Sequence, residues 1–109
     1  MKTIANALIL VCTLLFVVAA NGQSASAGRA KAAQACNVCH GENGMSQQPN
    51  APNLAGQPAI YTVEQLKAYR SGKRSNEVMS VMAKPLTDTE IDDLSAWFES
   101  IKVTAQLPK

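Results

Sequence analysis

Apolar residues recur with helical spacing near the end of this chain. They form a stripe with most neighbours three residues apart: Ile91, Leu94, Trp97, Phe98 and Ile101. Such spacing places the side chains on one face of an α-helix, which can be buried against the rest of a fold. Thr87 and Glu90 stand where a capping box needs its N-cap and N3 residues. The sequence therefore predicts an amphipathic helix that begins after Thr87.

A second helical pattern covers the middle of the chain. Its apolar and aromatic residues are spaced to share one helical face: Ile60, Tyr61, Leu66 and Tyr69. Pro58 stands where a first helical turn tolerates proline, and Gly72 stands where a C-terminal cap is expected. We predict a helix between these two residues.

A third helix is predicted over residues 28–36, where alanine is frequent. Its small side chains would let another helix approach closely; the alternative is an alanine-rich surface helix. Residues 23–27 predict a short flexible lead, and residues 45–56, rich in Gln, Asn and Pro, predict an ordered loop. Residues 76–85 are also assigned to a connection, because proline discourages helix in the residue before it. No segment alternates like a strand, so we expect an all-α fold with three main helices.

The beginning of the chain has the pattern of a secretory signal peptide. Lys2 precedes an apolar run over residues 4–20, and small residues follow it. We predict a signal over residues 1–22, export to the periplasm, and one domain over residues 23–109. Cleavage is expected in the interval 20–27, after one of three small residues: Ala20, Gly22 or Ala27. Cys12 lies inside the apolar run and is interpreted as part of the signal; the alternative is an uncleaved membrane anchor.

Candidate chemistry is concentrated in the segment Cys36-Asn37-Val38-Cys39-His40, which has the form C-x-x-C-H. This is the attachment signature of a c-type haem. Thiols three residues apart can add to two vinyl groups on one porphyrin edge, and the next histidine then lies under the iron. We therefore predict one haem c, covalently bound through Cys36 and Cys39, with His40 as an iron ligand.

Three other uses of a C-x-x-C pair were considered. A zinc site would need a second Cys/His pair, but His40 is the only histidine and Cys12 is the only cysteine outside the motif. A thioredoxin-like redox pair would need a βαβ pattern around it, which is missing. The third alternative is a structural disulfide.

Size and charge fit the haem interpretation. The 109 residues leave room for one domain, and removal of the signal leaves no cysteine outside the motif for disulfides. Exported domains this small usually need a staple, which a covalently held apolar haem would supply. The formal net charge is only +2, with no basic stripe or aromatic platform, so we expect no nucleic-acid binding.

A six-coordinate haem needs a second axial ligand, and no histidine remains for it. Methionine is the natural candidate, because a thioether binds iron and raises the reduction potential. Met45 follows His40 too closely to reach the other face of the iron. Met79 and Met82 are both distant enough, and the chemistry of the sequence alone does not separate them.

Taken together, the motifs resemble those of the class I c-type cytochromes, and are most similar to the small bacterial cytochrome c4 and c553 domains. The resemblance spans about Gly28 to Lys102 and rests on these segments, in the order of the family: Gly28 with the alanine-rich helix into C-N-V-C-H-G; A-P-N-L-A-G-Q at 51–57; Tyr61 with Gln65-Leu66; Gly72-Lys73-Arg74; Met79-Ser80-Val81-Met82; and Leu86-Thr87 ahead of Trp97-Phe98. The c4-type proteins carry two such domains and this chain has one, so it looks like a single-haem relative.

The resemblance implies a cytochrome c fold, with three main helices and loops wrapped around one covalent haem. The family's axial methionine stands eight residues before the Ser/Thr cap of the last helix, which favours Met79 over Met82. In similar proteins a proline carbonyl, here that of Pro52, accepts a hydrogen bond from the proximal histidine. The first and last helices cross with a glycine against an aromatic residue, which here would be Gly28 and Trp97.

The function expected from these features is that of an exported electron carrier, not an enzyme. Met/His ligation closes both axial positions, so the iron can exchange single electrons with redox partner proteins without binding a substrate. We expect a monomer without stable membrane insertion after signal cleavage. The alternatives are the haem-bearing subunit of a larger oxidoreductase complex, and a ligand-binding haem protein in which Met79 does not stay on the iron.

Overall fold

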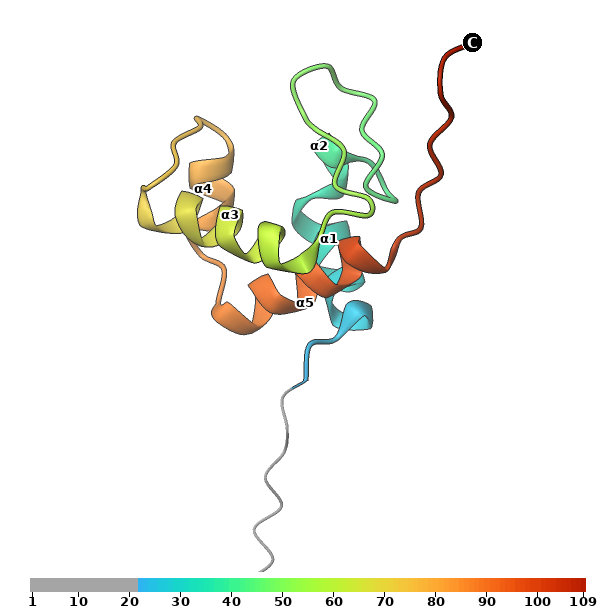
Figure 1. The fold of residues 1–109 in the computed structure, drawn as a ribbon. Coiled ribbons are helices and arrows are strands. Elements are labelled where there is room, and N and C mark those ends of the chain that lie inside the picture. Colours follow the sequence, from blue (N-terminus) through green and yellow to red (C-terminus); the bar gives the residue numbers. More distant parts are fainter. Residues whose placement is uncertain (1–21) are drawn as a thin grey trace, which may run out of the picture.

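The computed structural model describes residues 22–109, and its regular elements are all helices (Figure 1). In chain order they are α1 (Ala25–Ala35), α2 (Asn37–His40), α3 (Ala59–Ser71), α4 (Met79–Ala83) and α5 (Asp88–Ser100). No strand occurs between residues 22 and 109. The prediction of an all-α fold with three main helices is confirmed, and α2 and α4 are short additions to it.

Residues 1–21, nearly the whole of the predicted signal peptide, lie outside the described part of the chain. The signal, its cleavage and the interpretation of Cys12 therefore stay predictions. From Gly22 onward, no helix is both long enough and apolar enough to cross a membrane.

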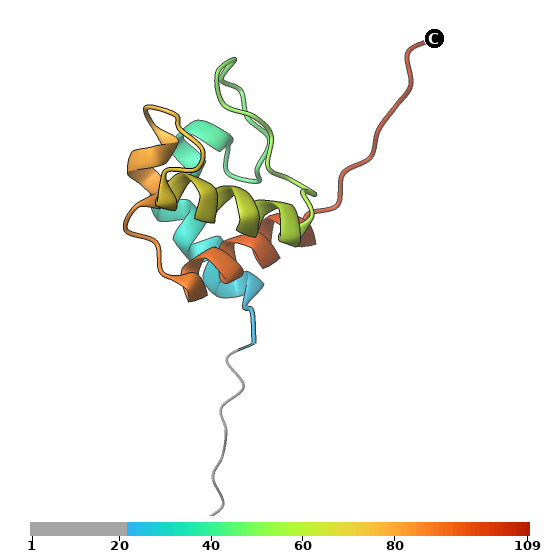
Figure 2. The same cartoon turned by 60° about the vertical axis from the view of Figure 1, so that its left-hand side comes forward.

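α5 supplies most of the hydrophobic core. Its capping box is present as predicted: Glu90 N donates to Thr87 Oγ1 at 3.1 Å, and Thr87 N donates to Glu90 Oε2 at 3.0 Å. The buried apolar side chains form one cluster: Ala32, Ala83, Leu86, Ile91, Leu94 and Phe98. α1 and α3 both pack against α5, and Figures 1 and 2 show α1 crossing it while α3 lies alongside.

The crossing of α1 and α5 depends on Gly28, which is buried. A Cβ atom added there would collide with the backbone carbonyl of Asp93 and lie 2.9 Å from Trp97 Cβ. The expected contact between Gly28 and Trp97 is therefore confirmed, and the alternative of an isolated surface helix is wrong. The two backbones approach so closely that no side chain fits between them.

The flexible lead predicted for residues 23–27 is wrong, because α1 already begins at Ala25. Ser24 is its N-cap and accepts a hydrogen bond from Ala27 N at 3.1 Å. Ser24 N donates to Asp93 Oδ1 of α5 at 2.7 Å. This second bond joins residues far apart in the sequence, so the local composition could not reveal it.

α3 begins after Pro58, its N-cap, and ends at Gly72, which has the left-handed φ of 84° expected of a glycine cap. Its predicted apolar face is only partly buried. Leu66 and Tyr69 pack against the core cluster, whereas Ile60 is 74% exposed. Tyr61, Leu66 and Tyr69 also line a cavity beside α3, which Ile60 does not reach.

The connection predicted for residues 76–85 contains the short helix α4. Asn76 Oδ1 accepts hydrogen bonds from Val78 N at 3.0 Å and Met79 N at 2.9 Å, which satisfies the free amides at the start of this turn. The helix ends at Ala83, before Pro85, as the proline requires. Asn76, three residues before Met79, was the sequence signal for this helix.

Candidate cofactor site

A cavity of about 670 Å³ lies between the C-x-x-C-H segment, the following loop and helices α3 and α4. Its lining is drawn from most parts of the chain and is mainly apolar, with these side chains among it: Leu54, Tyr61, Leu66, Tyr69, Met79, Met82, Ala83, Leu86, Leu94 and Phe98. One face of α3, Leu94 and Phe98 of α5, and both methionines of α4 thus line the same cavity. Apolar surface predominates in the cavity, as it does in most cofactor sites, and polar side chains such as Gln48, Asn50 and Gln57 line the rest of it.

Cys36, Cys39 and His40 line one wall of this cavity. α2 places them there, because its single turn brings residues three and four positions apart to one face. Both cysteines are free thiols. Burial raises the pKa of the Cys36 thiol to about 11, and the nearby charge of Lys31 only partly opposes this effect. The thiols and the imidazole are therefore presented together to one space.

His40 is buried and its ring is held in one orientation. Its Nδ1 atom lies 2.7 Å from the carbonyl oxygen of Pro52, the contact expected from the resemblance. A carbonyl can only accept, so Nδ1 carries the proton and donates it. The Nε2 atom then keeps its lone pair for a metal, and the carbonyl makes the imidazole a more basic ligand.

Met79 and Met82 line the cavity as well, from α4. Both are half-buried, so the structure brings both sequence candidates to the site without selecting one. Met45 is 42% exposed and is absent from the cavity lining. Its exclusion in the sequence analysis agrees with this placement.

By its residue type and its place after the Gly72 cap, Arg74 could belong to a solvated basic end or pair with a haem carboxylate, and the structure places it in the cavity lining. The left-handed turn at Gly72 folds the chain back, and Arg74 N donates to Ala68 O at 3.1 Å. The guanidinium stacks 4.7 Å above the Tyr69 ring, and Nη1 donates to Gln65 Oε1 at 2.6 Å.

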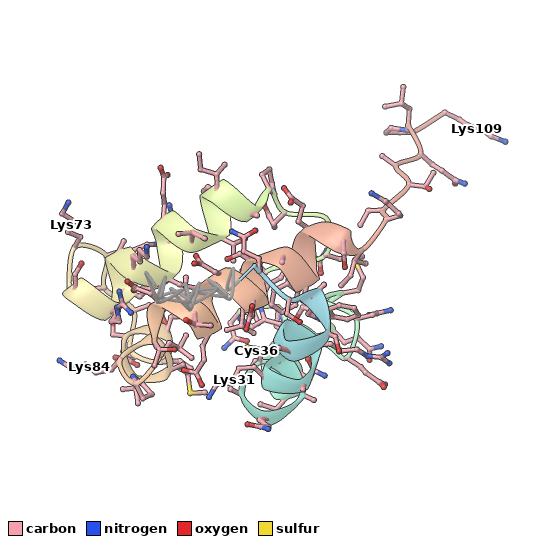
Figure 3. All side chains as sticks on the ribbon, turned by 90° about the horizontal axis from the view of Figure 1, so that it is seen from below. Lys31, Cys36, Lys73, Lys84 and Lys109 are labelled. Carbon is pink, nitrogen blue, oxygen red and sulfur yellow. The ribbon has the colours of Figure 1, made fainter. Side chains whose placement is uncertain are left out.

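Two lysines at the same end of the molecule do not line the cavity. Lys73 and Lys84 are exposed and point outward from the end of the molecule formed by α3 and α4 (Figure 3). Within residues 22–109, Arg74 and Glu77 are the only charged side chains of the cavity lining. Arg74 is thus the one cationic side chain that this part of the chain places in the cavity, where Tyr69 and Gln65 hold it.

A second hollow of about 680 Å³ lies behind α2 and is open to solvent. It is lined by polar residues such as Arg29, Asn43 and Gln47, and contains neither His40 nor the methionines of α4. Its possible metal ligands are the Cys39 thiol, the Glu42 carboxylate and the Met45 thioether, and it contains no imidazole. The cavity that contains His40 is therefore the candidate site.

The residues around the candidate cavity fit a covalently attached haem. Two free thiols three residues apart and an imidazole with its Nε2 lone pair available stand on one wall, and two thioethers enter from α4. An apolar lining suits a porphyrin, and Arg74 suits its carboxylates. A zinc site would need further ligands, but residues 22–109 hold no group of three His, Cys, Asp or Glu side chains able to bind a metal.

Comparison with known proteins gives the same picture. The family model for cytochrome c matches residues 25–102. A cytochrome c4 from Thiocapsa roseopersicina is 49% identical over 72 residues, which cover 66% of this chain and 37% of that protein. A thiosulfate dehydrogenase electron acceptor from Stutzerimonas stutzeri is 41% identical over 86 residues, which cover 76% of this chain and 40% of that protein.

Solved structures agree with these sequence relatives. The crystal structure of reduced recombinant cytochrome c4 from Pseudomonas stutzeri matches with a TM-score of 0.68 at 37% identity, covering 74% of this chain and 47% of that one. The chain thus spans half or less of the length of these relatives.

Proposed function

The chain belongs to the cytochrome c family, as a class I c-type cytochrome of the c4 type with covalent haem c, and on this premise we propose that it carries single electrons between redox partners in the periplasm. The observation that carries the proposal is the shared cavity. It has a preoriented imidazole on one wall and thioethers entering from α4. Two closed axial positions favour electron transfer over substrate binding.

Four side chains would hold the haem. Cys36 and Cys39 would form the thioether links, and His40 would bind the iron through Nε2. Met79 would supply the second iron ligand, a choice that rests on the resemblance, because the family's methionine stands eight residues before the cap of the last helix; Met82 lines the cavity too. When bound, the haem supplies an iron that alternates between the ferrous and ferric states.

The remaining lining residues would exclude water and hold the geometry. Leu66, Leu94 and Phe98 present apolar surface to the cofactor, which lowers the local dielectric and raises the potential against a water-filled site. Arg74 offers its guanidinium to the haem carboxylates. Tyr69 and Gln65 hold it in place, so little side-chain entropy is lost when a carboxylate binds.

Partners would dock where the cofactor comes closest to solvent. Val38 and Val78 both line the cavity and are 80% and 54% exposed, so its rim is partly apolar and accessible. Small, weak interfaces of this kind suit transient redox encounters. One relative is named as the electron acceptor of a thiosulfate dehydrogenase, and an oxidoreductase of this general kind is the class of donor that we propose here.

Processing of the signal should spare the start of α1. Cleavage after Ala20 or Gly22 leaves Ser24 as the N-cap with its bond to Asp93. Cleavage after Ala27 would remove that cap and the first turn of the helix. We therefore favour the two earlier sites.

Mass and absorption of the exported protein test the function. Expressed with cytochrome maturation machinery, the mature protein should weigh one haem more than a polypeptide that starts at Asn21 or Gln23. Its spectrum should change reversibly on reduction, and the ferric form should show the weak far-red band of methionine ligation. A bare polypeptide mass would refute haem attachment, and ready binding of carbon monoxide by the ferrous form would favour a ligand-binding protein instead.

A further inference from the structure

The short helix α2 has C-terminal carbonyl groups that its own backbone cannot satisfy. Side chains of the following loop bind two of them. Ser46 Oγ donates to Cys39 O at 2.9 Å, and Gln48 Nε2 donates to Val38 O at 2.9 Å. The loop is thus fastened to two consecutive residues of the C-x-x-C-H segment.

The same serine fastens the loop to itself. Ser46 N donates to the side-chain oxygen Oδ1 of Asn53 at 2.8 Å, and Ser46 Oγ accepts from Gln48 N at 3.0 Å. The hydroxyl proton has a second acceptor, Gln48 O at 3.2 Å, but Cys39 O is nearer. Ser46 therefore ties the first part of the loop to the residue that follows Pro52.

These contacts close a ring that returns to the proximal histidine. It runs from Cys39 O to the Ser46 hydroxyl, from Ser46 N to Asn53 Oδ1, through the peptide bond to Pro52, and from Pro52 O to His40 Nδ1. The peptide bond between Cys39 and His40 completes it. The Pro52 carbonyl is thus held near the imidazole by its own hydrogen bond to His40 and by the bonds of Ser46 to Asn53 and Cys39.

We infer that Ser46 and Asn53 are positioning residues that hold the Pro52 carbonyl on His40 and so set the electron-donating strength of this iron ligand. Ser46 does not line the haem cavity, so it acts only through the ring. Asn53 does line the cavity, which makes Ser46 the cleaner residue for a test. The inference rests on the proposed role of His40 as the proximal ligand.

The direction of the effect follows from the chemistry of the hydrogen bond. A close carbonyl acceptor at Nδ1 makes the imidazole more basic, and a more basic ligand favours ferric iron. Opening the ring lets the Pro52 carbonyl move away from His40 Nδ1. The ferrous form should then become more stable relative to the ferric form, so the reduction potential should rise. Loss of the hydrogen-bond partner of a metal ligand typically has an effect of about tenfold. A tenfold change in the ferrous/ferric equilibrium constant corresponds to about 59 mV for one electron.

The test compares five variants of the haem-loaded protein. Ser46→Ala and Asn53→Ala each open the ring at a different bond, and Ser46→Thr keeps the hydroxyl. Gln48→Ala breaks only the bond to Val38 O outside the ring. Gln47→Ala is the matched control, since this exposed neighbour makes no side-chain hydrogen bond in the structure. Potentials are measured by redox titration, and exchange of the His40 Nδ1 proton is followed by NMR in the ferrous form.

Both ring-opening variants should raise the potential and speed exchange of the Nδ1 proton, while Ser46→Thr and Gln47→Ala stay at the wild-type values. Gln48→Ala should lower the unfolding midpoint; because Gln48 also lines the cavity, Gln47→Ala is the control for the potential. If Ser46→Ala yields no folded protein, the potential of Asn53→Ala tests the inference, because this variant opens the same ring. Equal potentials in wild type and both ring-opening variants would overturn the inference, even if their stability fell. A wild-type protein without covalent haem would refute the proposed function instead.

Discussion

At the scale of single residues, the open question is which methionine binds the iron. Met79 and Met82 are three residues apart on the single turn of α4, and both reach the cavity. Only the resemblance distinguishes them, because the family's axial methionine stands eight residues before the cap of the last helix, which is the distance from Met79 to Thr87. The two side chains are otherwise equivalent in chemistry and similar in burial.

Met79→Ala should abolish the far-red sulfur-to-iron band of the ferric protein. It should also lower the reduction potential and open the iron to carbon monoxide, because a thioether ligand favours ferrous iron. Met82→Ala is the matched control and should keep the band, since it removes an equal volume from the same helix. Loss of the band in Met82→Ala alone would reverse the assignment.

At the scale of elements, α1 and α5 cross with their backbones in close approach at Gly28. Hydrogen bonds and an ion pair reinforce the same pair of helices. Ser24 N binds Asp93, and Lys31 Nζ lies 2.8 Å from Glu90 Oε1. The hydrogen bond to Lys31 is the main reason why the pKa of Glu90 is lowered. The crossing thus has its tightest packing at Gly28 and polar contacts on both sides.

Gly28→Ala should destabilise the protein by about 1–3 kcal/mol, because the new methyl group meets the Asp93 carbonyl. The sign is informative, since Gly→Ala inside a helix otherwise stabilises it by about 1 kcal/mol. Denaturant unfolding of the holoprotein measures the change. Ala30→Val, at an exposed position of the same helix, is the control and should cost less than about 1 kcal/mol. A Gly28→Ala variant as stable as wild type would mean that the helices do not meet there.

At the scale of the whole molecule, the cavity takes the place of a larger core. In the described part of the chain six apolar residues form the buried cluster, whereas the cavity measures about 670 Å³. The apolar side chains that line it, such as Leu66, Leu94 and Phe98, would be covered by a bound haem and would contact water without one.

The chain without haem should therefore lose its cooperative tertiary fold. Protein made without maturation machinery, or as the double variant Cys36→Ala, Cys39→Ala, should retain some helix by far-ultraviolet circular dichroism but lose the near-ultraviolet signal. The holoprotein made from the same chain is the control and should melt in one sharp transition. An apoprotein that melts as sharply and at the same temperature would show that the polypeptide is sufficient for the fold.

Features that depend on neighbouring residues could be predicted from the sequence alone. The capping box at Thr87 and Glu90, the glycine end of α3 and the amphipathic stripe of α5 involve contacts within a few residues. The C-x-x-C-H segment is local in the same sense, because one helical turn suffices to present two thiols and an imidazole together. Sequence spacing therefore determined the fold class, the haem and its attachment.

Tertiary structure decided the features whose partners lie far away in the sequence. The start of α1 depends on Asp93, and the cavity position of Arg74 depends on Gln65 and Tyr69. The ring through Ser46 and Asn53 exists only because the loop folds back over α2. The physical reason is that spacing along a chain specifies which groups one turn of backbone can bring together, whereas contacts between separate segments, such as Ser24 with Asp93 and Ser46 with Asn53, form only once the helices and loops have packed.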